Sequence, residues 1–201
     1  MRQKALLAVI ALVVLVVGAP MAFAGTNLLT NGSFQNGDFS GWTQGGDFSF
    51  VQVVSGPFYV YAGSQDADGF YATMGPVGTD STLSQTFATT AGGQYTISFW
   101  LASVGDSPSD FSVSWDGTPM LSLTDPNTGV NWTQFSFTET GTGSDTLQFS
   151  FRDDPAYIAL DNVSVMPSTT GTTPEPTSLL LLGSGLLMVG GVVRRKFKAN
   201  R

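Results

Sequence analysis

Residues 95–101 read Tyr-Thr-Ile-Ser-Phe-Trp-Leu, and this stretch decides the fold class. Its apolar side chains stand at every second position: Tyr95, Ile97, Phe99 and Leu101. A period of two is typical of a β-strand with one buried face. The same alternation recurs at Phe111, Val113 and Trp115, at Phe135 and Phe137, and at Leu147, Phe149 and Phe151. These stretches predict half-buried strands whose inward faces share one core.

Turn-forming residues separate these stretches. They include Asn31-Gly32, Asp68-Gly69, Gly92-Gly93, Asp116-Gly117 and Asp153-Asp154-Pro155. Strands divided by turns about every 8–12 residues indicate an antiparallel β-sandwich. We therefore predict an all-β domain over residues 25–167, of the jelly-roll type, with Trp42 and Trp115 in its core.

Composition excludes several classes of function. The 201 residues include no cysteine and no histidine, so the chain has no disulfide, no zinc knuckle and no imidazole base. Between Gly25 and Thr173 the only basic residue is Arg152, against 14 acids, which gives 1 − 14 = −13. An acidic domain does not fit a nucleic-acid partner, because binding to phosphates requires a basic surface.

The N-terminus has the features of a secretion signal. Arg2 and Lys4 precede an apolar run of 13 residues over Ala5–Val17, and Ala22 and Ala24 supply the small residues that signal peptidase requires. We predict a signal peptide over residues 1–24 with cleavage after Ala24. The alternative is an uncleaved anchor, but a run of 13 residues is short for a membrane span.

The C-terminus has three parts after a Thr/Gly linker at residues 168–173. These are Pro174-Glu175-Pro176, an uncharged run over 177–193, and a basic cluster that includes Arg194, Arg195 and Lys196. At about 1.5 Å per residue, the 17-residue run reaches about 25 Å, which suits a transmembrane α-helix. The basic cluster is expected to stay in the cytoplasm, with the acidic domain on the opposite side of the membrane.

This tail resembles the PEP-CTERM sorting signal of Gram-negative bacteria. The resemblance covers residues 174–198. It implies recognition by exosortase, a membrane protease-transpeptidase, and an association with exopolysaccharide and biofilm export. The expected location is the inner membrane with a periplasmic domain, followed by the cell surface or the exterior after processing.

A second resemblance concerns the domain itself. The opening run Asn27–Phe34, the Gly41-Trp42 pair and the closing run Tyr157–Val165 are similar to carbohydrate-binding jelly rolls of the CenC type. In that family a structural calcium often ties the first strand to the last. The resemblance implies Asp161 as one ligand and Gln35 as another, where the family has Glu. The alternative for Asp161 is a carboxylate that accepts hydrogen bonds from backbone donors.

Two tryptophans stand out of phase with the apolar faces. Trp100 shares its phase with Thr96 and Ser98, and Trp132 shares its phase with Gln134 and Ser136. Aromatic rings on a polar sheet face can stack on the apolar faces of sugars. The alternative is that loops cover these rings, which then serve packing.

Three functions follow from these observations. The first is a non-enzymatic, exported surface or matrix protein whose domain contacts polysaccharide. The second is a secreted glycoside hydrolase that uses pairs of Asp residues, although no recognisable catalytic constellation is present. The third is a structural domain that associates with itself.

Overall fold

The computed structural model describes residues 25–59, 61, 63–65, 69–154 and 156–168. The signal peptide at 1–24, most of the linker, the sorting signal at 174–198 and its helix at 177–193 lie outside the described residues. So do Ala22, Ala24, Pro174, Glu175, Pro176, Arg194, Arg195 and Lys196. The described part of the chain contains no helix with the length and apolarity that a membrane crossing requires.

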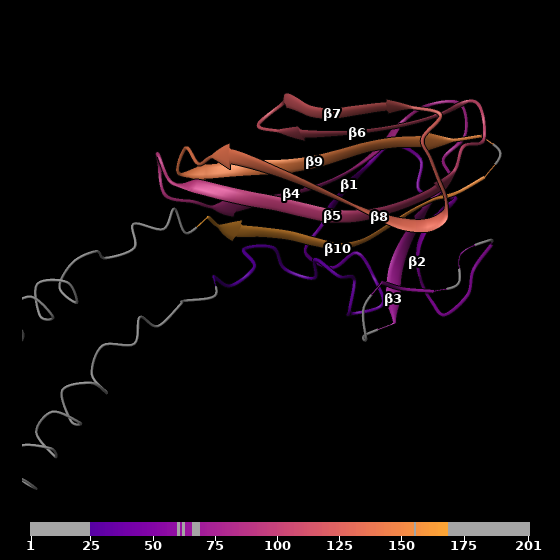
Figure 1. The fold of residues 1–201 in the computed structure, drawn as a ribbon, viewed down its shortest axis with the longest axis horizontal. Coiled ribbons are helices and arrows are strands. Elements are labelled where there is room, and N and C mark those ends of the chain that lie inside the picture. Colours follow the sequence, from indigo (N-terminus) through magenta and orange to yellow (C-terminus); the bar gives the residue numbers. More distant parts are fainter. Residues whose placement is uncertain (1–24, 60, 62, 66–68, 155, 169–201) are drawn as a thin grey trace, which may run out of the picture. The chain divides into compact units, whose positions relative to one another are not determined.

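The described residues form an antiparallel sandwich of two five-stranded sheets (Figure 1). The first sheet has the order β1 (Thr43–Gly45), β4 (Ser81–Ala88), β9 (Ser144–Asp153), β6 (Ser109–Trp115) and β7 (Thr118–Thr124). The second has the order β2 (Val51–Ser55), β3 (Phe70–Met74), β10 (Ile158–Pro167), β5 (Gln94–Val104) and β8 (Asn127–Thr140). The prediction of an all-β antiparallel sandwich is confirmed.

The core lies between the two sheets and uses the predicted alternating positions. Phe149 of β9 contacts Phe99 of β5 across the sandwich, with ring centroids 5.3 Å apart. Phe149 also packs on Trp42 and Phe111. Trp42 and Trp115 are buried, at 7% and 4% exposed, as the sequence predicts. The core cluster draws only on the segment from Leu28 to Val165, so residues 25–168 bury their own core and form one compact unit.

The N-terminal segment lies beside the last strand without being a strand itself. The amide of Leu28 donates to the carbonyl of Val165, and the Asn27 side chain bonds to Val163 and Val165. A Cβ at Gly32 would stand 2.2 Å from the Val163 carbonyl oxygen, so this close approach requires glycine. These contacts tie the two ends of the described domain together.

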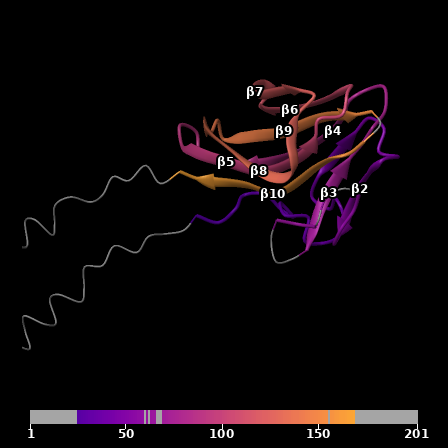
Figure 2. The same ribbon diagram turned by 45° about the vertical axis from the view of Figure 1, so that its right-hand side comes forward.

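The second sheet is strongly twisted. In both views β2 and β3 run steeply across the direction of β5 and β10 (Figures 1 and 2). The connection from β2 to β3 returns over residues 56–69. This connection brings side chains to the outer face of the second sheet, which carries the candidate site.

Candidate functional site

The outer face of the second sheet centres on Trp100. Leu101 and Leu160 point into the core, so their neighbours Trp100 and Asp161 lie on the opposite face. Trp100 is directly opposite Asp161 on β10 and opposite Gln134 on β8. Its side chain is half-buried. The structure therefore places Trp100 on a polar face, between an amide and a carboxyl group.

A loop after β2 lies against this face. We call its described residues 56–59, 61 and 63–65 the aromatic loop. Phe58 and Tyr61 exchange backbone hydrogen bonds of 3.2 and 3.0 Å, which closes a tight turn around Tyr59. The Tyr61 hydroxyl donates to the Tyr157 carbonyl, and the Tyr71 hydroxyl donates to the Gly56 carbonyl at 3.0 Å. The loop is thus bound to both β3 and the segment before β10.

Trp132 serves to hold this loop. Its indole N–H donates to the Gly63 carbonyl at 3.0 Å. Its ring packs edge-on against Tyr71 at 5.7 Å and on Tyr61 at 6.5 Å. The structure therefore matches the alternative in which a loop packs over Trp132. A sugar-stacking role for its remaining exposed surface stays a prediction.

Asp161 is fully buried and holds the end of the loop. Its carboxylate accepts hydrogen bonds from the Ser64 hydroxyl at 2.8 Å and from the backbone amides of Gln65 at 2.7 Å and Asn162 at 2.6 Å. Two of these donors are backbone amides, as the alternative interpretation of Asp161 expects. Gln35 is exposed, and its side-chain oxygen accepts from the Ser33 hydroxyl at 3.0 Å. Calcium ligation by Gln35 and Asp161 stays a prediction.

The hydrogen bonds that Asp161 accepts bear on whether its carboxylate can bind calcium. Calcium takes six to eight oxygen ligands, whereas the described residues contain no group of three or more acidic side chains placed to hold a metal. A calcium ion at Asp161 would compete with the hydrogen bonds from Ser64 and Gln65 for the carboxylate oxygen Oδ2. The described residues show Asp161 as a hydrogen-bonded carboxylate, and calcium binding there stays a prediction.

The calcium prediction is tested by thermal unfolding of residues 25–168. If calcium binds the folded state alone, millimolar calcium raises the melting temperature by mass action, and Asp161→Asn removes that rise. Magnesium at the same concentration is the control. Identical melting curves in calcium and in chelator would show that the site does not exist.

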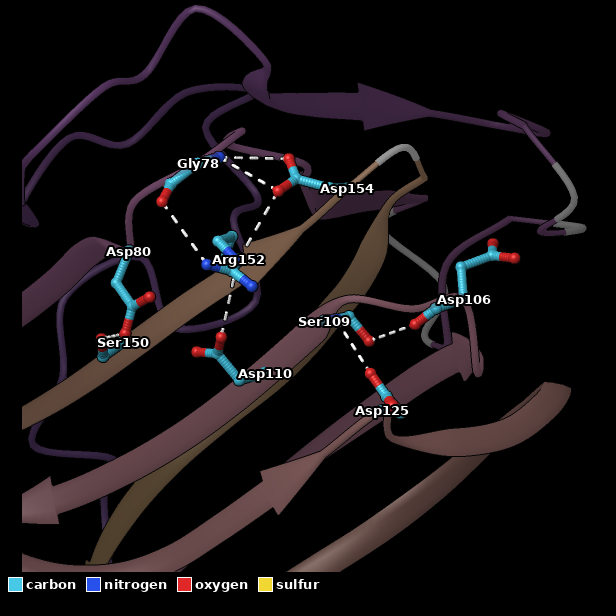
Figure 3. Close-up of polar contacts among 9 residues, drawn as sticks. All are labelled: Gly78, Asp80, Asp106, Ser109, Asp110, Asp125, Ser150, Arg152 and Asp154. Carbon is cyan, nitrogen blue, oxygen red and sulfur yellow. Dashed lines mark hydrogen bonds and ion pairs between the residues drawn. The ribbon is translucent and has the colours of Figure 1, made fainter.

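A second polar cluster gathers around Arg152 of β9 (Figure 3). The Arg152 guanidinium stands 3.7 Å from carboxylate oxygens of both Asp110 and Asp154. It also donates to the Gly78 carbonyl at 3.4 Å. Burial and the neighbouring Asp80 raise the pKa of Asp110, while Arg152 opposes that rise. Arg152, the one basic residue between 25 and 168, therefore pairs with both Asp110 and Asp154.

Asp153 lies beside this cluster but points into the sandwich. It is 0% exposed, and neither carboxylate oxygen has a hydrogen-bond partner of normal geometry in the described part of the chain. Burial raises its pKa to about 7, and repulsion from Asp106, Asp154 and Asp125 adds to this, while the Ala156 amide offsets part of the effect. The prediction of a turn at Asp153-Asp154-Pro155 is therefore wrong for Asp153, which ends β9 on its inner face.

A pKa near 7 is what a catalytic general acid requires. A glycosidic oxygen must reach the acid, however, and Asp153 has no exposed surface. Asp153 therefore has a pKa that would suit a general acid, but its burial prevents contact with a substrate. It does not support the hydrolase interpretation.

The sequence interpretation missed the aromatic loop. Phe58 packs edge-on against Tyr157 at 5.2 Å, and Tyr59 lies 5.7 Å from the same ring. Tyr59 is 53% exposed. The sequence signal for this loop is a cluster of aromatic residues directly after Gly56-Pro57. These aromatic residues do not alternate with a period of two, so they do not indicate a strand.

Comparisons with known proteins identify the tail and the fold. The model of the PEP-CTERM protein-sorting motif matches residues 172–196, so the chain carries this motif. No curated protein sequence matches significantly. The carbohydrate-binding module TmCBM61, solved with β-1,4-galactotriose, is 19% identical with a TM-score of 0.58, and the match covers 71% of this chain and 99% of that one.

Two further solved structures are similar. The enzymatically active domain of tailspike protein 4 from bacteriophage CBA120 is 18% identical over 70% of this chain, with a TM-score of 0.51, and the match spans only 21% of that protein. The CBM22-1 xylan-binding domain of Paenibacillus barcinonensis Xyn10C is 18% identical over 73% of this chain and 97% of that one, with a TM-score of 0.47. At these identities the likeness to the two structures with TM-scores above 0.5 shows the fold alone, a jelly-roll sandwich.

Proposed function

We propose that this chain is an exported surface protein, sorted by exosortase through its C-terminal motif, whose jelly roll binds polysaccharide without catalysing a reaction. The motif at residues 172–196 supports the sorting part. It implies a protein that is anchored in the membrane before processing. Final display at the cell surface or in the extracellular matrix belongs to the proposal.

The position of Trp100 is the observation that supports polysaccharide binding. A half-buried indole stands on the outer face of a sheet, in register with Gln134. The indole offers an apolar surface to the C–H face of a sugar ring, and the amide offers a donor and an acceptor to hydroxyl groups. A site that combines aromatic surface with a few placed polar groups suits an uncharged, hydroxyl-rich ligand.

Affinity electrophoresis of residues 25–168 tests this proposal. Native gels containing β-1,4-galactan or xylan should retard the wild-type domain, and Trp100→Ala should weaken the interaction by about tenfold or more, as loss of a central aromatic contact does. Phe50→Ala is the control, because Phe50 is 50% exposed and belongs neither to the aromatic loop nor to the strand that carries Trp100. Equal retardation of wild type and Trp100→Ala would remove Trp100 from the site.

Enzymatic action is the less favoured alternative. The buried position of Asp153 argues against its use as a general acid. Release of reducing sugars from the same polysaccharides would nevertheless establish a hydrolase.

One observation favours self-association as a second candidate. β8 is 14 residues long, forms an edge of the second sheet, and carries Glu139 as its only charged residue. A long edge strand with few charges offers unpaired backbone groups to another chain. Slower bands in gels without polysaccharide, at rising protein concentration, would support this candidate.

A further inference from the structure

Tyr59 occupies a backbone conformation that its side chain disfavours. Its φ is +52°, in the left-handed region where bulky residues are uncommon because Cβ crowds the backbone. Phe58 and Tyr61 are bridged on either side of it, so Tyr59 is the first central residue of a tight turn. Such turns favour Asn or Gly at this position. A tyrosine here costs stability that a glycine would not.

The surrounding structure holds this conformation in place. At the end of the turn, Tyr61 is 1% exposed, and its hydroxyl donates to the Tyr157 carbonyl. Further along the loop, Trp132 donates to Gly63, and Asp161 accepts from Ser64 and Gln65. These bonds join residues that are 69 to 97 positions apart in the sequence. The loop is therefore fixed against the sheet rather than shaped by its own sequence.

The ring of Tyr59 is supported on its inner side and open on the other. It lies 5.7 Å from the Tyr157 ring at an interplanar angle of 60°, and 6.3 Å from the Tyr61 ring at 58°. Yet 53% of the residue is exposed. A strained backbone that is held by many contacts and presents an exposed ring is typical of a ligand-binding position.

We propose that Tyr59 is a stacking residue of the polysaccharide site, and that the ligand is a neutral polysaccharide rather than a polyanionic one. This inference rests on the proposed function and extends it from Trp100 to the aromatic loop. The fixed ring matches a pyranose face that presents C–H groups, and little conformational entropy is lost on binding because the loop is already ordered.

Charge determines the class of polysaccharide. Between Gly25 and Thr173 the net charge is 1 − 14 = −13, and the sequence of residues 56–69 holds two acids, Asp66 and Asp68, and no base. A negative field of this size repels a uronic-acid polymer. A neutral chain of hexose or pentose units meets no such repulsion.

The test compares three variants of residues 25–168 in native gels that contain β-1,4-galactan, xylan or polygalacturonate. Tyr59→Gly should bind the neutral polysaccharides about tenfold more weakly or worse, without a lower melting temperature, because glycine relieves the φ strain. Tyr59→Phe keeps the ring and should bind like wild type. Phe50→Ala, an aromatic of similar exposure outside the loop, should also bind like wild type.

The outcomes separate this inference from the proposed function. Retention of wild-type binding by Tyr59→Gly, in a domain whose Trp100→Ala variant has lost binding, would overturn the role of Tyr59 alone. A marked fall in the melting temperature of Tyr59→Gly would assign Tyr59 to folding instead. Stronger retardation by polygalacturonate than by the neutral polymers would overturn the ligand class. Absence of binding by wild type would overturn the proposed function, and the inference with it.

Discussion

Replacement of Pro174, Glu175 and Pro176 by alanine is expected to leave the protein in the membrane fraction at full, unprocessed size. Because proline fixes φ and disfavours a helical residue before it, we expect Pro174 and Pro176 to keep the chain extended before the predicted membrane helix. A protease at the membrane surface would then meet an exposed segment at a fixed height. The match of residues 172–196 to the sorting motif supports this role. The alanine variant removes the segment and retains the anchor.

Two further variants show that the parts of the tail act separately. Neutralising Arg194, Arg195 and Lys196 should disturb retention or orientation, because positive charges hold the cytoplasmic end of a membrane helix. Deleting residues 177–201 should release a soluble, folded domain, since the core is complete within 25–168. The measurement is the size and membrane fractionation of each variant in a host that contains exosortase. Normal processing of the alanine variant would reduce Pro174–Pro176 to a linker.

The sandwich was predictable because its signal is local. Alternating residues such as Ile97 and Phe99 show their faces within a few positions, and the structure buries both. The core position of Trp115 followed from the same alternation, in phase with Phe111 and Val113. The polar phase of Trp100 also predicted its outer face correctly.

The site was less predictable because its contacts are long-range. Tyr61 bonds to Tyr157, 96 positions away, and Ser64 bonds to Asp161, 97 positions away. Neither pair leaves a pattern that a window of the sequence can show. The resemblance to calcium-binding jelly rolls gives no sign that Asp161 also accepts hydrogen bonds from Ser64 and Gln65 of the aromatic loop.

Asp153 shows a different limit. An Asp-Asp-Pro sequence favours an exposed turn, since aspartate, asparagine and proline dominate turns. The alternation of β9 overrides this tendency, because Asp153 continues the inward phase of Phe149 and Phe151. The turn-forming tendency of this stretch therefore predicts an exposed Asp153, whereas the fold buries it.

Substitution of Asp153 by asparagine is expected to stabilise the domain at neutral and alkaline pH. The pKa of this carboxyl rises from 3.8 to about 7 in the folded state. As the pH rises from about 4 to about 7, the unfolded chain has already lost this proton while the folded chain still binds it. The unfolding free energy therefore falls across that window, and above it the loss caused by this group stays constant.

The size of the effect follows from about 1.4 kcal/mol for each unit of pKa. Asp153 lies at the end of its strand, where relaxation and water penetration on ionisation reduce the full value, so we expect on the order of 2–4 kcal/mol at pH 8. Asparagine has a similar shape and no charge to desolvate. It removes the penalty of burying an unpaired carboxylate, although it leaves a polar group without a partner.

Urea unfolding of wild type and Asp153→Asn between pH 4 and pH 9 measures this difference directly. The difference between the two proteins is the relevant quantity, because other carboxyls act in the opposite direction. Hydrogen bonds from Thr89 and Thr142 outweigh burial and lower the pKa of Asp145 to about 2, so its stabilising contribution is lost only in acid. Asp154→Asn is the matched control: the Asp154 carboxylate pairs with Arg152 at 3.7 Å and accepts from the Gly78 amide at 3.1 Å, and asparagine keeps an acceptor oxygen there, so this substitution should change stability little at any pH. Parallel pH profiles for wild type and Asp153→Asn would mean that Asp153 is paired or hydrated in solution, since a buried, unpartnered carboxylate must lose stability as it ionises.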